Sequence, residues 1–117
     1  MSRVSGEKYL SQITIPGTHD SCADHNSKCG TAKRWYECQD KTVTEQLNLG
    51  VRFLDIRFKH KNDKFMINHG GCFLRYTFDG VMQTLKDFLT ANNQENGTFL
   101  DLGNVQIQSK VLCIGTT

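Results

Sequence analysis

The segment from Ser11 to Ser21 constrains this chain more than any other part of the sequence. A strand-like apolar run, Gln12 to Ile15, stops at the turn Pro16-Gly17, and His19 and Asp20 follow at once. In parallel-sheet enzymes the functional side chains follow the carboxyl ends of the strands. We therefore expect His19 and Asp20 to lie at such a strand end, as a base and a carboxylate.

Two later segments supply further polar groups. Asp55 and Arg57 lie in the run Gly-Val-Arg-Phe-Leu-Asp-Ile-Arg, where they alternate with apolar residues and so share one face of a strand. His69 precedes the pair Gly70-Gly71, which predicts close approach of a ligand or of another backbone. Two histidines, two aspartates and an arginine can cleave a phosphodiester by acid–base catalysis. Each also has a simpler reading, as a turn or strand-end residue or a surface ion pair.

Length and charge exclude several classes of protein. A chain of 117 residues suits one small domain, and a net charge of +2 without a Lys/Arg run gives no indication of nucleic-acid binding. No apolar stretch has the length of a transmembrane segment, and residues 1–10 lack the apolar core of a signal peptide. A complete chain would be expected in the cytoplasm, whereas a piece of a longer precursor could be secreted.

The five cysteines are odd in number, which argues against a closed disulfide framework and favours reduced or incidental thiols. A zinc-binding module is an alternative, because a histidine and three cysteines lie close together in the sequence. Its ligands would be Cys22, His25, Cys29 and Cys38, although no Cys-x-x-Cys pair is present.

Strand-like and helix-like segments alternate along the chain. Thr42-Val-Thr-Glu45 is a capping box, Gly50 is a typical residue just after a helix, and Asn62-Asp63 predicts a turn. This alternation favours an α/β fold with parallel pairing. The sequence predicts helices over 42–49 and 77–91, and strands over 12–15, 51–58, 64–68, 98–102 and 110–114.

In their order and amino-acid sequence, these segments resemble the catalytic X domain of phosphatidylinositol-specific phospholipases C of the bacterial type. The combination of Pro-Gly-Thr-His-Asp-Ser with Gly-Val-Arg-Phe-Leu-Asp-Ile-Arg is specific. The resemblance covers about residues 1–95, and residues 96–117 diverge from it. Its matching stretches are Leu10 to Ser21, Trp35 with Gln39, Thr42 to Arg57, Asn68 to Gly70, and Phe78 to Asn92.

The resemblance implies a role for each polar residue. His19 would be the general base that deprotonates the inositol 2-hydroxyl, which attacks phosphorus and expels diacylglycerol to leave a cyclic inositol phosphate. His69 would be the general acid for the departing oxygen, and Asp20 would pair with His69. Arg57 would bind the non-bridging phosphate oxygens, and Asp55 would orient Arg57.

The resemblance also implies a reaction without a cofactor or a metal ion. In the calcium-dependent branch of the family an acidic ligand occupies the position of Arg57, and a guanidinium there would repel the cation. The partner would be a phosphatidylinositol-type lipid at a membrane surface.

The family fold is a distorted (β/α)₈ barrel, which needs on the order of 250 residues. A chain of 117 residues supplies about four strands, so we expect an incomplete barrel, about its first half, without the second half. The later carboxylate that orients His19 in the family has no counterpart here. Weak or absent activity is therefore expected, and the alternative function is an inactive fragment or a module that binds lipid headgroups or a partner.

Overall fold

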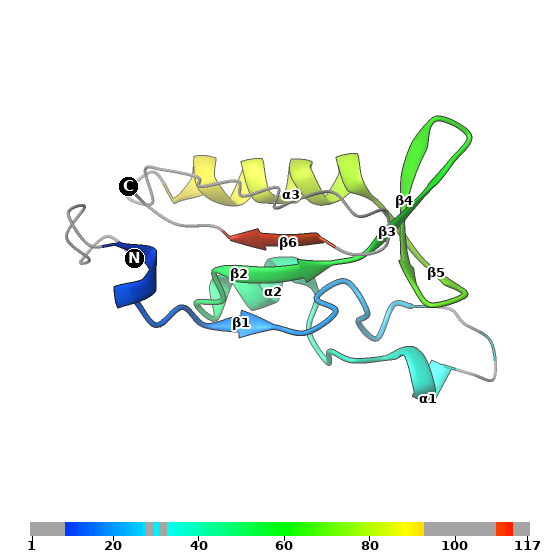
Figure 1. Cartoon of the computed structure of the whole chain (residues 1–117), viewed down its shortest axis with the longest axis horizontal. Helices are drawn as coiled ribbons and strands as arrows, with labels where there is room; N and C mark the ends of the chain where they lie inside the picture. Colours follow the sequence, from blue (N-terminus) through cyan, green and yellow to red (C-terminus); the bar gives the residue numbers. More distant parts are fainter. Residues whose placement is uncertain (1–8, 28–29, 31–32, 93–109, 114–117) are drawn as a thin grey trace.

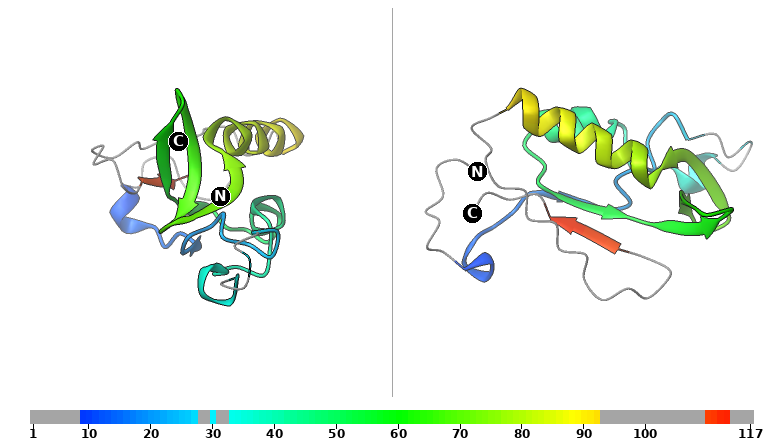
Figure 2. Two further views of the ribbon diagram at one scale, coloured as in Figure 1. Left: turned by 90° about the vertical axis from the view of Figure 1, so that its right-hand side faces the viewer. Right: turned by 90° about the horizontal axis from the view of Figure 1, so that it is seen from above.

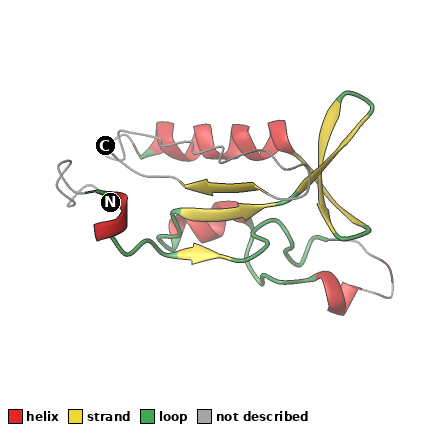
Figure 3. Ribbon diagram, viewed as in Figure 1, coloured by secondary structure: helices red, strands yellow, loops and turns green. Residues whose placement is uncertain are grey.

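A computed structural model describes residues 9–27, 30, 33–92 and 110–113 of the chain. It is an α/β arrangement of two three-stranded sheets and a few helices, as the sequence predicts (Figures 1 and 3). The strands are β1 (Gly17–Thr18), β2 (Phe53–Ile56), β3 (Phe58–Lys61), β4 (Lys64–His69), β5 (Cys72–Thr77) and β6 (Lys110–Cys113). The helices are the 3₁₀-helix η1 (Leu10–Gln12), α1 (Lys33–Tyr36), α2 (Val43–Asn48) and α3 (Phe78–Ala91).

Parallel pairing is limited to β1 and β2. The first sheet has the order β1-β2-β6, and β6 runs antiparallel to β2. The second sheet, β3-β4-β5, is fully antiparallel, so the expectation of parallel pairing is wrong for most of the strands. The reason is local, because β3 and β4 are joined by a two-residue turn, and such turns connect only antiparallel strands. Both turn residues, Asn62 and Asp63, have positive φ angles of 50° and 56°.

Helix α2 begins and ends as its sequence predicts. The Thr42 side chain accepts from the Glu45 N–H, and the Glu45 carboxylate accepts from the Thr42 N–H at 2.8 Å, which completes the capping box. After the helix, Gly50 has a φ of 100°, a conformation that glycine adopts without steric cost. The Gly50 N–H donates to Leu47 O, and the Val51 N–H donates to Gln46 O, so two terminal carbonyls are satisfied.

The predicted strand over 12–15 is wrong. That segment holds the end of η1 and irregular backbone, and the strand forms two residues later at Gly17–Thr18. Gly17 lies directly against Phe53 of β2, because a Cβ atom at position 17 would approach Phe53 Cδ1 to 2.8 Å. The absence of a side chain at Gly17 thus leaves room for the Phe53 side chain where β1 pairs with β2.

The predicted strand over 51–58 is interrupted at Arg57, where the chain passes from one sheet to the other. Before this point the Asp55 carbonyl accepts from the Ser21 N–H, and at Arg57 the carbonyl accepts from the Asn68 N–H, each at 2.9 Å. Figure 1 shows β2 leading directly into the β3–β4 hairpin. Strand β5 was not predicted, β6 matches the expected strand up to Cys113, and the strand expected over 98–102 lies outside the described residues.

One apolar core joins β2 to the two longer helices. Leu54 and Ile56 are fully buried on one face of β2, and α2 and α3 pack against each other on that face (Figure 2). The helices contribute Val43 and Leu47 from α2 and Val81, Leu85 and Phe88 from α3. Burying five such side chains contributes about 1.5–3 kcal/mol each. This core supports the strand whose carboxyl end carries Asp55 and Arg57.

The cysteines differ from the expectation. Cys22 and Cys38 are free thiols, as expected, but Cys72 is disulfide-bonded. The odd count of cysteines therefore did not exclude a disulfide. Cys22 is buried and Cys38 is exposed, so only one of these two free thiols is open to solvent.

Candidate active site

The turn that carries His19 and Asp20 follows β1 and is fastened to β2. Asp20 adopts a φ of 48°, a left-handed conformation that aspartate tolerates better than most residues. Next to it, the Ser21 hydroxyl accepts from the Asp55 N–H at 2.9 Å and donates to the Thr18 carbonyl at 3.0 Å. The Asp20 N–H donates to Asp55 Oδ2 at 3.1 Å. These contacts bring the carboxyl ends of the two parallel strands together.

The side chain of Gln46, in α2, holds the same turn by hydrogen bonds. Its side-chain oxygen accepts from the Thr18 hydroxyl at 2.6 Å, and its Nε2 donates to the carbonyls of Ser21 and Lys41 at 2.8 and 2.7 Å. Gln46 is buried, so these hydrogen bonds satisfy an amide that would otherwise be costly to bury. This role of Gln46 was not predicted, because a glutamine in an amphipathic helix gives no signal for it in the sequence.

Asp55 holds Arg57 from the side by two contacts. Arg57 Nε donates to Asp55 Oδ1 at 3.3 Å, and Nη2 donates to Oδ2 at 2.9 Å. The hydrogen bond that Arg57 donates to Asp55 is the main reason why the pKa of Arg57 is raised. A fork of this geometry orients the guanidinium as well as attracting it. The remaining Arg57 nitrogen, Nη1, lies 3.3 Å from Asp20 Oδ2.

His19 lies at the open side of this ion pair. Its Nδ1 is 3.3 Å from Asp55 Oδ2 and 3.3 Å from Arg57 Nη2, and two thirds of its side chain is exposed. A guanidinium has only donors, so Nδ1 accepts from Arg57 in this contact, and the approach to Asp55 is an ion-pair distance without a hydrogen bond. Asp55 is nevertheless a carboxylate within this chain that lies beside His19, a position that was not predicted from the sequence.

Asp20 is the buried centre of the site. Its side chain is 1% exposed, and Oδ2 lies 3.3 Å from Arg57 Nη1 and 3.4 Å from His69 Nε2. Neither contact has the geometry of a hydrogen bond, so Oδ2 is a buried oxygen without a hydrogen-bond partner among the described residues. Burial raises the pKa of Asp20. The neighbouring His69 and Arg57 oppose that shift, and Asp55 adds to it.

His69, at the end of β4, reaches the site from the second sheet. Its Nδ1 donates to the Tyr36 carbonyl at 3.1 Å, and its ring contacts the Tyr36 ring edge-on with centroids 5.5 Å apart. Its Nε2 faces Asp20. Both ring nitrogens thus face oxygen acceptors, and an imidazolium can donate to both. The Tyr36 carbonyl carries no sequence signal, because any residue supplies one.

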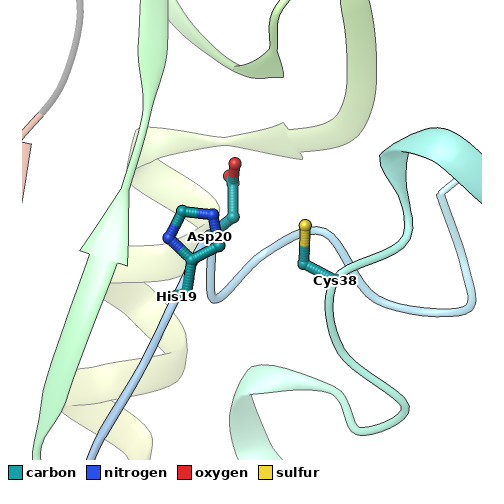
Figure 4. Close-up of side chains that lie close together, drawn as sticks. All are labelled: His19, Asp20 and Cys38. Atoms are coloured by element: carbon teal, nitrogen blue, oxygen red, sulfur yellow. The ribbon is translucent and has the colours of Figure 1, made fainter.

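The segment after α1 adds two side chains to the site. Gln39 Nε2 donates to the His19 carbonyl at 2.5 Å, and Cys38 Sγ lies 3.8 Å from His69 Nδ1. The Cys38 and Gln39 N–H groups both donate to Ala23 O, which ties this segment to the turn after β1. Figure 4 shows Cys38 beside His19 and Asp20, from a segment distant in sequence. Gln39 was expected to matter only as part of a matching stretch. That Cys38 lies beside His19, Asp20 and His69 was not predicted from the sequence.

All five predicted polar residues thus lie in one cluster: His19, Asp20, Asp55, Arg57 and His69. His25 and His60 are exposed, as expected, and they lie outside it. The Gly70-Gly71 pair forms the two-residue turn between β4 and β5, with a φ of 56° at Gly70. Its conformation therefore serves a hairpin turn, and the space expected there for a ligand is not needed to explain the glycines.

The zinc module considered from the sequence is not assembled by its described members. Among the residues that the structure describes, the histidine, cysteine and acidic groups near enough to share a metal ion are His19, Asp20 and Cys38. Cys22 and His25 are not part of that group, and Cys29 lies outside the described residues.

Comparison with known proteins relates this chain to a single protein family. The family model PI-PLC X 1 matches residues 5–110. The 1-phosphatidylinositol phosphodiesterase of Listeria monocytogenes is 34% identical over 96 residues, which cover 81% of this chain and 29% of the relative. PI-PLC X domain-containing protein 2 of Homo sapiens is 31% identical, over 81% of this chain and 38% of that protein.

A solved structure of the phosphatidylinositol-specific phospholipase C of Staphylococcus aureus superposes with a TM-score of 0.72 and 31% identity. The match covers 86% of this chain and 32% of that one. The chain therefore spans about a third of the length of the relatives that it matches. No helix among the described residues has the length and the apolar character needed to cross a bilayer.

Proposed function

Because this chain belongs to the phosphatidylinositol-specific phospholipase C X-domain family, we propose that it carries a phosphodiester-cleaving site for phosphatidylinositol-type lipids. The products would be a cyclic inositol phosphate and diacylglycerol. The substrate would be met at a membrane surface, and the α/β unit would be about the first half of a TIM-type barrel. The Staphylococcus aureus relative, of which the chain covers 32%, supports this reading of the fold.

The position of Arg57 is the observation that carries the proposal. Its guanidinium lies within 3.3 Å of Asp20 Oδ2 and of His19 Nδ1, and Asp55 holds it from the side. A fixed guanidinium can form paired hydrogen bonds to two non-bridging phosphate oxygens. A phosphate bound there would lie beside a histidine on each side of Asp20.

The two histidines would divide the proton transfers. When Arg57 turns its Nη2 donor to the phosphate, the Nδ1–H of His19 would donate to Asp55, and the Nε2 lone pair would take the proton of the inositol 2-hydroxyl as that oxygen attacks phosphorus. The bond from phosphorus to the diacylglycerol oxygen breaks, and His69 gives its Nε2 proton to that oxygen. Asp20, 3.4 Å from His69 Nε2, would orient the His69 ring for this transfer. Arg57 stabilises the charge on the non-bridging oxygens.

The test uses matched histidine variants of the 117-residue chain. Phosphatidylinositol in mixed micelles is incubated at high protein concentration, and cyclic inositol phosphate is measured. We expect His19→Ala and His69→Ala each to reduce its formation by at least about 100-fold, the usual contribution of a general acid or base. His25→Ala and His60→Ala, at exposed positions outside the cluster, should have no effect. Equal loss in all four variants, or in none, contradicts the proposal.

Metal dependence provides a second test. Arg57 and Asp55 neutralise each other where a calcium ion would otherwise need carboxylate ligands. We expect the rate of cyclic product formation to be the same in EGTA and in added calcium. A rate that rises with calcium and disappears in EGTA would show that Arg57 does not take the place of the ion.

The alternative is a chain that binds the headgroup without cleaving it, favoured by its span of about a third of its relatives. Vesicle co-sedimentation separates the two. Binding to phosphatidylinositol vesicles that is lost in Arg57→Ala, with no cyclic product at any protein concentration, would favour this alternative.

A further inference from the structure

Cys38, His19 and Asp20 form a cluster whose composition goes beyond what phosphodiester cleavage requires. The three side chains come from two segments, yet an imidazole nitrogen, a carboxylate oxygen and the thiol sulfur all lie within 4.8 Å of one another. Figure 4 shows that the three groups extend to the same side, with a ring nitrogen of His19 facing Asp20 and Cys38. The proposed acid–base reaction uses the histidine and the carboxylate and gives the thiol no role.

We propose that His19, Asp20 and Cys38 bind a divalent transition-metal cation of the zinc class. Imidazole, carboxylate and thiolate are the ligand types that Zn²⁺ prefers. A thiolate is a poor ligand for Ca²⁺ or Mg²⁺, which take oxygen atoms. Three protein ligands leave the fourth tetrahedral position to water.

The geometry requires only a small adjustment. Zinc–ligand bonds of about 2.0–2.3 Å at a tetrahedral angle separate the ligand atoms by about 3.5 Å. The present separations are at most 4.8 Å, so the ligand atoms must move closer together to reach that value, and rotation of the Cys38 side chain can bring its sulfur nearer. Cys38 can do so because it is exposed and lines an open pocket with Glu37, Gln39 and Asp40.

The Asp20 carboxylate gives independent support. It is 1% exposed, and its Oδ2 lies beside Arg57 and His69 without completing a hydrogen bond to any described residue. A buried carboxylate oxygen of this kind can coordinate a metal ion.

The charges are also suitable. Once the metal ion displaces the Cys38 thiol proton, the thiolate, Asp20 and Asp55 carry three negative charges beside the positive charge of Arg57, and the divalent cation balances them. Arg57 would stay paired with Asp55, and His69 would remain beside Asp20 and help to orient it.

This consequence rests on the proposed function: the bound metal ion would inhibit phosphodiester cleavage. A metal ion on His19 and Asp20 takes the lone pair that the general base needs. The site would therefore make the reaction sensitive to zinc-class cations, although the chemistry itself uses no metal.

Direct metal binding tests this without reference to turnover. The metal-free chain is titrated with Co²⁺, which gives a thiolate charge-transfer band and strong visible bands when tetrahedral, and Zn²⁺ affinity is then measured by competition. We expect one equivalent to bind. His19→Ala and Cys38→Ser should each weaken binding by at least about 10-fold, the loss seen when even an orienting partner of a ligand is removed. Cys38→Ser should also abolish the thiolate band.

His25→Ala is the matched control, since His25 belongs to the alternative zinc module and is exposed. Unchanged affinity in His25→Ala together with the losses above supports the site. Loss in His25→Ala, or full affinity in Cys38→Ser, overturns it.

A second measurement uses the unaltered chain, so it does not depend on the folding of a variant. Alkylation of Cys38 by iodoacetamide, followed by peptide mass, should become at least about 10-fold slower with saturating Zn²⁺, because a coordinated sulfur is not available to react. An unchanged rate overturns the proposal. A chain that binds zinc here and cleaves no phosphatidylinositol would refute the proposed function while leaving this site standing.

Discussion

The buried carboxylate of Asp24 is stabilised by hydrogen bonds to both of its oxygens. Its side chain is fully buried, Oδ1 accepts from the Asn26 N–H at 2.9 Å, and Oδ2 accepts from the Tyr76 hydroxyl at 2.5 Å. Tyr76 comes from β5, the strand that the sequence did not predict. The hydrogen bond thus ties the long loop after β1 to the second sheet.

Removing the Tyr76 hydroxyl should destabilise the fold. Burial, and then the hydrogen bond to Asp24, raise the pKa of Tyr76 well above its ordinary value of 10.0. The native state therefore keeps the phenol proton, while the unfolded state loses it above about pH 10. Since the native pKa is the higher one, this contribution to the free energy of unfolding is complete below about pH 10 and is lost as the pH rises further.

We expect Tyr76→Phe to lower the free energy of unfolding by about 1.5–3 kcal/mol near neutral pH, the usual value of a hydrogen bond to a charged group. The variant should also lose the part of the decline in the free energy of unfolding that Tyr76 causes above about pH 10. Urea unfolding at several pH values measures both effects. Tyr9→Phe, at an exposed position, is the control. Identical pH profiles for Tyr76→Phe and the unaltered chain would contradict this expectation.

At the scale of elements, α2 is the support of the candidate site. It packs on β2 through Val43 and Leu47, and through Gln46 it holds three polar groups of the neighbouring loops. The helix has only six residues, too few to be stable alone. Its end contacts and its tertiary packing must therefore maintain it.

Gln46→Met keeps the size of the side chain and removes its polar contacts. It leaves the Ser21 and Lys41 carbonyls without this donor, which should cost on the order of 3 kcal/mol in the free energy of unfolding. The Ser21 amide should also exchange faster with deuterium, because the turn that carries Asp20 is loosened. Gln83→Met in α3, an exposed site, should change stability by less than about 0.5 kcal/mol. Equal effects of the two substitutions would show that Gln46 is not a support.

At the scale of the whole molecule, the candidate site is open. Two thirds of the His19 side chain is exposed, and the chain spans about a third of its relatives. Water next to the guanidinium raises the local dielectric constant and weakens its hold on a phosphate. The carboxylate contact from Asp55 to His19 lessens this deficit and does not close the site.

We therefore expect the 117-residue chain to release cyclic inositol phosphate slower than the Staphylococcus aureus relative by a factor on the order of 10³–10⁴. The two proteins are compared on the same vesicles, with His19→Ala as the background. A rate within about tenfold of the relative, abolished in His19→Ala, would show that these residues suffice.

Features that depend on neighbouring residues could be predicted from the sequence alone. The capping box at Thr42, the glycine at position 50 and the apolar periodicity from Phe78 to Ala91 each gave a helix boundary close to the observed one. Such signals are local, so they survive without knowledge of the fold. The convergence of His19 with Asp55 followed from a simple rule, that parallel strands end at the same edge of a sheet.

Features that depend on contacts between distant segments could not be predicted without the folded structure. The chain changes sheets at Arg57 because two different backbones satisfy the carbonyls of Asp55 and Arg57, and no local pattern specifies which backbone arrives. The Tyr36 carbonyl orients His69 through an atom that every residue possesses. Cys38 lies beside Asp20 because its N–H is bound to the Ala23 carbonyl, a pairing between loops that neither composition nor periodicity encodes.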